Sequence, residues 1–246
     1  MKKFFDYIKD FQIGLLGLFI AFAILIVSLI VSDNVSNKNI TVTGSAFEIV
    51  KSDSASWVFK VEARANSKNQ AYQIVKNQIP VVEKYLLANG IAKENIDLVS
   101  QNFWETYKLN PTTGYSTSEV SAYNFSQNIK VTSNDVQKIK NLSTKILELL
   151  AQGINISSDE NPQYQYSKLS ELKVELLAKA TKYAKQRAQS MLKSNHNRTG
   201  KIRTAKMGVF QITPVDSNSV SDMGVNDLSS IEKKVTAVAN VVFEIK

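Results

Sequence analysis

Hydrophobic positions change their spacing along the chain, and this spacing predicts strands alternating with helices. In residues 54–65, Trp57, Phe59, Val61 and Ala63 alternate with Lys60, Glu62 and Arg64, as in a strand with one buried face. Residues 67–89 instead carry apolar side chains every three or four positions, which indicates an amphipathic helix. Ser67 and Gln70 have the spacing of a capping box at its start, and Gly90 follows its end. These residues therefore predict a strand followed by a helix.

The chain from residue 40 onward continues this pattern and predicts an α+β fold. We expect strands at 40–50, 96–108, 119–132, 201–212 and 235–245, an extended segment at 154–166, and helices at 134–152 and 167–194. In the first strand the apolar positions change parity at Gly44, which predicts a β-bulge. Pro111 and Gly114 predict a hairpin loop over 109–118. Residues 213–230 are rich in Ser, Asp and Asn, and we expect either a disordered segment or an interaction loop.

A hexapeptide, Leu-Leu-Ala-x-Gly-Ile, occurs at 86–91 and again at 149–154. Each copy ends a predicted amphipathic helix and precedes an extended segment. Two interpretations follow from this. The hexapeptide is either a common way to end a helix, or the mark of two related strand–helix–strand units.

The N-terminus contains the longest apolar run, with 22 uncharged residues over 11–32. A helix of that length spans about 33 Å, enough for a hydrocarbon core of about 30 Å. Lysines in the tail 1–10 place that end in the cytoplasm, so a stalk at 33–39 and a domain at 40–246 would be exported. We expect an uncleaved single-pass signal anchor in the cytoplasmic (inner) membrane. A cleaved signal peptide and a buried helix of a soluble protein are the alternatives.

The composition excludes several classes of chemistry. The 246 residues include no Cys and one His, which excludes disulfide scaffolds, cysteine-ligated metals and thiol catalysis. His196 stands at the end of the third predicted helix, where we expect a solvated residue rather than a base. Asp159 and Glu160 are adjacent carboxylates, but a cation site needs more oxygen ligands, so we expect a polar loop. No catalytic or nucleotide-binding motif is present, and we expect no enzyme activity, cofactor or metal site.

Aromatic residues flank the predicted hairpin loop. They are Phe103, Trp104, Tyr107, Tyr115, Tyr123 and Phe125. Packing on a sheet face is one interpretation. The other is an aromatic interface that contacts a protein partner or a lipid surface.

The charge is positive, with 30 basic and 22 acidic residues giving +8. Without the three lysines and two aspartates of residues 1–10, the part that would be exported keeps +7. Its basic residues are spread along helix faces without interleaved stacking aromatics, and export separates them from nucleic acid, so we expect no nucleic-acid partner. The third predicted helix carries Lys173, Lys179, Lys182, Lys185 and Lys193. They form either a solvated face or a contact for an anionic lipid surface or envelope polymer.

Several segments, taken in order, resemble the SIMPL-domain family of exported bacterial proteins. They are Ile40–Ala46 (ITVTGSA), Asp53, Gly90-Ile91, Ala122-Tyr123 with Ser126-Gln127, Gly153-Ile154, the alanine-rich helix Ala178–Leu192, and Val241–Phe243. Two departures stand at turns or close approaches. Ser52-Asp53 replaces the usual Pro-Asp, and Ala122 replaces the usual Gly before Tyr123.

The resemblance implies an antiparallel sheet with packed helices and a tendency to form ring-like homo-oligomers, but no reaction. Relatives include a periplasmic immunogen and a protein for oxidative-stress defence. We therefore expect a non-enzymatic, membrane-anchored envelope assembly protein or scaffold, linked to envelope or oxidative stress. The alternative is a binding module for an anionic envelope component through the lysine-rich helix. An exported hydrolase has no support beyond the presence of carboxylates.

Overall fold

A computed structural model describes residues 15–28 and 38–246. The chain divides into two compact units. The larger consists of residues 45–183 and 207–239, and the smaller contains residues up to 44, 184–206 and 240–246. Three long elements, β1 (Asn39–Lys51), α4 (Leu169–Lys193) and β10 (Glu232–Ile245), contribute residues to both.

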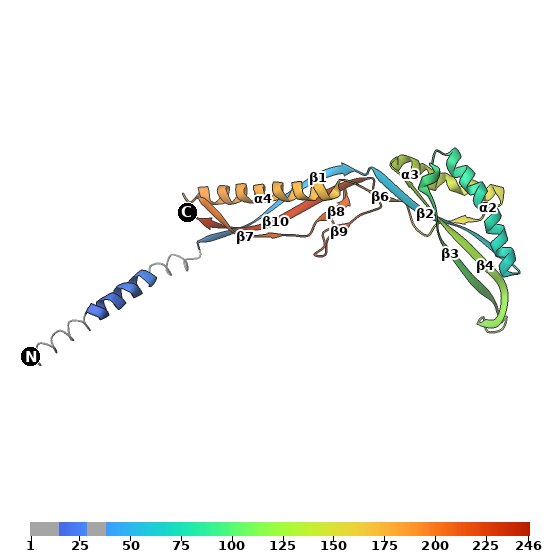
Figure 1. Cartoon of the computed structure of the whole chain (residues 1–246), viewed down its shortest axis with the longest axis horizontal. Helices are drawn as coiled ribbons and strands as arrows, with labels where there is room; N and C mark the ends of the chain where they lie inside the picture. The colour runs from blue at the N-terminus through green and yellow to red at the C-terminus, as the bar shows by residue number, and fades with distance from the viewer. Residues whose placement is uncertain (1–14, 29–37) are drawn as a thin grey trace, which may run out of the picture. The chain divides into compact units, whose positions relative to one another are not determined.

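The larger unit contains a five-stranded antiparallel sheet covered by helices on one face (Figure 1). Its elements are β2 (Ser54–Ala65), α2 (Lys68–Ala88), η1 (Lys93–Asn95), β3 (Ile96–Leu109), β4 (Ser116–Ser133), α3 (Val136–Lys145), η2 (Ile146–Gln152), β5 (Ile156–Ser157) and β6 (Gln163–Gln165). The strand order is β3-β4-β2-β5, with β6 also on β2. This is the order of the ferredoxin-like split βαβ motif, in which two strand–helix–strand units interlock.

The two hexapeptide copies end the helical segments of these two units, α2 in the first and η2 in the second. The repeat in the sequence therefore coincides with a repeat in topology. The second helix differs from the expected continuous helix over 134–152. Its last seven residues tighten into the 3₁₀ helix η2, which is a frequent way for an α-helix to end.

The core of this unit lies between the sheet and the helices. Trp57, Phe59 and Val61 of β2 are almost completely buried, as their alternation predicts. They pack with the buried residues of α2, such as Val75 and Leu86, in one continuous cluster. Ser67 caps α2 as expected, because its hydroxyl accepts a hydrogen bond from the Gln70 amide.

A second sheet has the order β1-β10-β8-β9, with β7 also pairing with β10. Its shorter strands are β7 (Thr199–Met207), β8 (Gln211–Pro214) and β9 (Val225–Asn226). The prediction of a β-bulge at Gly44 is wrong, because buried and exposed side chains alternate along β1 without interruption. Gly44 and Ala46 keep the parity of Val42, and Phe47 and Ile49 point outward, 65% and 51% exposed.

The segment 213–230 is an ordered part of the larger unit. It contains β9, which pairs in parallel with β8. The Gln211 side chain donates a hydrogen bond to the Ser221 carbonyl and accepts one from the Ser221 amide. Lys234 donates to the Ser217 carbonyl. These contacts hold the excursion against the strands that flank it.

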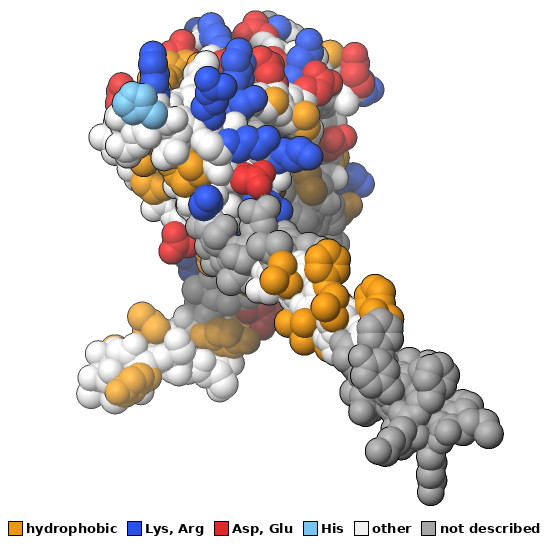
Figure 2. Space-filling view, turned by 90° about the vertical axis from the view of Figure 1, so that its left-hand side faces the viewer, with side chains coloured by type: hydrophobic (Ala, Val, Ile, Leu, Met, Phe, Trp, Pro, Cys, Tyr) orange, Lys and Arg blue, Asp and Glu red, His pale blue; other side chains and the backbone are white. Residues whose placement is uncertain are grey.

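The expected membrane anchor at 11–32 lies partly outside the described residues. Residues 15–28 are helical, and all their side chains are exposed. In Figure 2 hydrophobic side chains gather on the surface of this segment. Among the described helices, none has both the length and the hydropathy needed to cross a membrane.

Candidate interaction surface

The edge strand β3 is the most exposed element of the larger unit. It has 14 residues, and all except Ile96, Glu105 and Thr106 are exposed. Six of its exposed residues are large and apolar or aromatic: Leu98, Val99, Phe103, Trp104, Tyr107 and Leu109. Among residues 15–28 and 38–246, β4 is the one strand that pairs with β3. An open strand edge with apolar side chains is a template for pairing with another chain.

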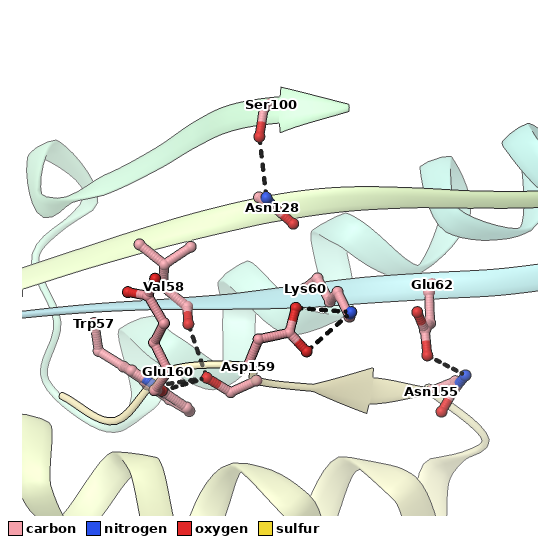
Figure 3. A network of polar contacts seen from close by, with 10 residues as sticks. Trp57, Val58, Lys60, Glu62, Ser100, Asn128, Asn155, Asp159 and Glu160 are labelled. Atoms are coloured by element: carbon pink, nitrogen blue, oxygen red, sulfur yellow. Dashed lines mark hydrogen bonds and ion pairs between the residues drawn. The ribbon is translucent and has the colours of Figure 1, made fainter. Parts of the chain in front are cut away.

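The opposite edge of the same sheet is covered. β5 and β6 both pair with β2, and the loop between them is held by side chains of β2 (Figure 3). The Trp57 indole donates to the Ser158 hydroxyl and to the Glu160 carbonyl, each at 3.0 Å. Ser158 in turn donates to the Val58 carbonyl at 2.9 Å. The sheet therefore presents one protected edge and one open edge.

Three of the expected aromatic residues gather on the helix-covered face of the hairpin. The rings of Phe103 and Tyr123 stack with centroids 6.3 Å apart, and Tyr72 of α2 meets Phe125 edge-on at 5.3 Å. The Lys68 ammonium lies over both stacked rings, 5.0 Å from Phe103 and 5.7 Å from Tyr123. Phe125 is buried and belongs to the core, which is the packing interpretation for that residue.

A polar network extends this aromatic group. The Glu105 carboxylate forms an ion pair with Lys68 at 3.1 Å and accepts a hydrogen bond from the Tyr107 hydroxyl at 3.0 Å. Both contacts stabilise the carboxylate, and they lower the pKa of Glu105. The Glu105 carboxylate raises the pKa of Tyr107 through the same hydrogen bond. This part of the hairpin therefore holds its side chains in defined positions while it remains exposed.

The remaining two aromatic residues lie apart from this group. Trp104 stands opposite Asn124 in the β3–β4 register, whereas Phe103 and Glu105 stand opposite Phe125 and Tyr123, so Trp104 is on the other face. Tyr115 is 78% exposed in the hairpin loop. The loop spans only residues 110–115, shorter than the expected 109–118, because the strands extend to Leu109 and Ser116.

The lysines expected to contact an anionic surface do not share one environment. Lys179 forms ion pairs with Glu48 at 3.1 Å and Glu175 at 2.7 Å. Lys173 lies over the Phe210 ring at 5.4 Å. Lys182, Lys185 and Lys193 are exposed. Two of the five positive charges are therefore already engaged with neighbours in the protein, and a role for the set in anionic binding stays a prediction.

The residues considered above as catalytic or metal-binding candidates include Asp159 and His196. Asp159 forms an ion pair with Lys60 at 3.0 Å (Figure 3). His196 has a φ of 58° in the turn that follows α4. Within residues 15–28 and 38–246, no three His, Asp or Glu side chains lie close enough together to hold a metal ion.

Sequence reasoning missed two features. It predicted β3 as a strand, but it could not tell which strand lies at an edge, since this depends on pairing between distant segments. It also missed the buried pair Lys233 and Asp227. A signal for Lys233 was present, because this lysine falls on the same parity as the buried residues Val235 and Ala237 of β10.

Comparison with known proteins gives one informative match. Residues 40–243 match the model of the SIMPL family, described as a protein of unknown function (DUF541). No curated protein matches the chain. A hydrolase from Listeria innocua is 10% identical, covering 81% of this chain and 91% of its own, with a TM-score of 0.21. An uncharacterized conserved protein from Listeria innocua is also 10% identical, covering 81% and 92%, with a TM-score of 0.19. Such low TM-scores support no conclusion about fold or activity.

Proposed function

The chain belongs to the SIMPL family, whose function is unknown, and we propose that it is a non-enzymatic, membrane-anchored assembly protein. In this proposal residues 11–32 anchor each copy in the cytoplasmic membrane, and the exported part associates with further copies through the β3 edge. The resulting homo-oligomer acts as a scaffold in the cell envelope.

The exposure of β3 carries this proposal. An edge strand of a monomeric protein is normally short, charged, bulged or covered. β3 is long, and among the described residues it pairs on one side only. Its register against β4 shifts at three places, one between Leu98 and Gln101 and one on each side of Tyr107. Its exposed residues nevertheless include Leu98 and Trp104, 50% and 42% exposed. The other edge of the sheet is covered by β5 and β6. β3 of a second copy, running antiparallel, would satisfy the open backbone groups and cover these apolar side chains together.

The N-terminal sequence supports anchoring. The run over 11–32 contains no charged residue, and the described part of it, 15–28, is helical with exposed apolar side chains such as Leu18 and Phe22. Exposed apolar surface of this kind favours a lipid environment. Confinement to a membrane raises the local concentration of the exported parts, so a weak contact at β3 would be sufficient for assembly.

The test compares two leucine-to-lysine substitutions in the full-length protein. Leu98→Lys places a charge on β3, whereas Leu87→Lys places the same charge on α2 at a residue of similar exposure, 46% against 50%. We expect Leu98→Lys to lower the sedimentation coefficient of the purified protein in detergent, and Leu87→Lys to leave it unchanged. Both variants should keep a cooperative melting transition.

Two results would contradict the proposal. If Leu98→Lys sediments like the parent, the β3 edge is not the interface. If the parent itself is monomeric both in detergent and in lipid nanodiscs, the assembly function is wrong.

A further inference from the structure

A buried lysine lies beside a cavity in the larger unit, away from the β3 edge. The cavity has a volume of about 270 Å³ and lies between β8, β10, β6 and the start of α4. Its lining includes Lys233, Asp227 and Tyr164, together with the apolar Leu169, Ile212 and Val235. Lys233 is only 3% exposed. A lysine is almost never buried to this extent without a specific arrangement of partners.

The partners of Lys233 use only part of its hydrogen-bonding capacity. An ammonium group has three N–H donors. The Lys233 ammonium donates to the Asp227 carbonyl oxygen at 2.7 Å, and its contact with the Asp227 carboxylate is longer, at 3.6 Å. Within the described residues, the Asp227 carbonyl is the one hydrogen-bond acceptor that Lys233 has. A buried cation with spare donors beside a cavity favours a ligand that brings an acceptor oxygen.

The Asp227 carboxylate has hydrogen-bond donors besides Lys233. It accepts hydrogen bonds from the Ser229 amide and hydroxyl, at 2.9 and 2.7 Å, and from the Ser230 amide at 3.3 Å. Burial alone would raise the pKa of Asp227, but these hydrogen bonds and the charge of Lys233 lower it. Asp227 therefore stays ionised at neutral pH. Burial lowers the pKa of Lys233, and the charge of Asp227 opposes this shift. With Lys233 protonated, the pair carries no net charge.

We propose that this cavity binds a small, neutral, mostly apolar molecule whose carbonyl oxygen accepts a hydrogen bond from Lys233. The apolar walls formed by Leu169, Ile212 and Val235 would contact the body of the ligand. A carboxylate is disfavoured, because it would add a second negative charge beside Asp227. A ligand that only donates hydrogen bonds is disfavoured, because it would leave the spare donors of Lys233 without an acceptor.

Three six-membered-ring probes of similar size distinguish these cases. Cyclohexanone is neutral and offers a carbonyl, cyclohexanecarboxylate is an anion, and cyclohexylammonium is a cation that only donates. Each is titrated into the full-length, methyl-labelled protein in lipid nanodiscs and observed by NMR. We expect cyclohexanone to cause saturable shifts of the Leu169, Ile212 and Val235 methyl groups. The carboxylate should bind at least about tenfold more weakly, and the ammonium should cause no shifts.

Two variants test the hydrogen-bond donor and the apolar lining of the cavity separately. Lys233→Met keeps the length of the side chain and removes the donors, and it should weaken cyclohexanone binding about tenfold. Leu169→Phe adds volume inside the cavity while it keeps both residues of the ion pair, and it should abolish binding. This variant tests the proposal if Lys233→Met does not fold. The methyl groups of Val75 and Val82, on the buried face of α2, serve as the control and should not shift.

The proposal is overturned if cyclohexanone causes no saturable shift at these three residues. It is also overturned if the ammonium or the carboxylate binds as tightly as the ketone, since Lys233 would then not select a neutral acceptor. These outcomes are independent of the oligomeric state, so they do not bear on assembly through β3.

Discussion

Gly90 and Gly153 end their helical segments in the same conformation and with the same hydrogen bonds. Their φ angles are 79° and 78°. The Gly90 amide donates to the Leu87 carbonyl and the Ile91 amide to the Leu86 carbonyl. In the second copy the Gly153 amide donates to Leu150 and the Ile154 amide to Leu149. Glycine adopts a positive φ without steric cost, so the repeated hexapeptide encodes one defined turn.

The end of α4 forms the same turn without glycine. The Asn197 amide donates to the Leu192 carbonyl and the His196 amide to the Lys193 carbonyl, and His196 has a φ of 58°. A side chain in this conformation costs roughly 1–2 kcal/mol, partly offset by the lower unfolded-state entropy relative to glycine. We predict that His196→Gly raises the stability by up to about 1 kcal/mol, measured as a higher urea midpoint.

Gly153→Ala is the matched opposite of that change. A Cβ on Gly153 would meet no atom within 4 Å, so the substitution isolates the backbone cost. It should lower the stability by about 1 kcal/mol. A His196→Gly variant less stable than the parent would show that the imidazole makes a stabilising contact that outweighs its strained backbone.

Asp53 holds the residue before α4 in place and makes the free energy of unfolding depend on pH. Its carboxylate accepts hydrogen bonds from the Ser167 amide at 2.8 Å and hydroxyl at 2.6 Å. Burial acts to raise the pKa of Asp53, but these hydrogen bonds lower it below the usual 3.8. Between the two values the unfolded chain binds more protons, so this stabilisation is present above pH 3.8 and is lost as the pH falls through the folded-state pKa.

We predict that Asp53→Asn destabilises the protein by about 1–2 kcal/mol at pH 7. It should also reduce the loss of stability on acidification below pH 3.8. Urea unfolding at several pH values measures both effects. Asp159→Asn, which removes an exposed ion pair with Lys60, should change stability by less than about 0.5 kcal/mol and is the control. If both variants show the same pH dependence as the parent, Asp53 does not contribute to it.

The hairpin loop should contribute to assembly and little to folding. Asn110 closes the loop through hydrogen bonds from the Thr112 and Thr113 amides, and Tyr115 projects into solvent. We predict that replacing residues 110–115 with Asn-Gly leaves the melting temperature within a few degrees and lowers the oligomeric state in sedimentation experiments. Unchanged sedimentation would confine the interface to the strand itself.

The N-terminal run should remain attached. We predict that intact-mass measurement of the purified protein finds residues 1–32 present, and that a reporter fused after Lys246 is active only when it requires the exported compartment. A mature N-terminus near Ser36 would contradict the signal anchor and favour a released protein.

The sequence predicted local structure better than it predicted which strands and side chains pair. The alternation in β2 and the cap at Ser67 depend on neighbouring residues, and both are confirmed. At Gly44 the pattern was misleading, because Phe47 and Ile49 are apolar but point outward, and hydropathy alone then mimics a change of face. The edge position of β3 depends on which distant segments pair, which no local pattern encodes. Lys233 and Asp227 are only six residues apart, and the parity of Lys233 with Val235 indicated its burial, but no pattern indicated Asp227 as its partner.

A contact made by β3 with itself has a consequence for symmetry. When the same strand from two copies pairs antiparallel, each copy offers and receives the same surface, so the contact is isologous and closes after two copies. The far edge of the sheet is formed by the short strands β5, of 2 residues, and β6, of 3 residues, so it offers no comparable length of strand from which to continue. A larger ring must therefore join such pairs through a different surface and should contain an even number of chains.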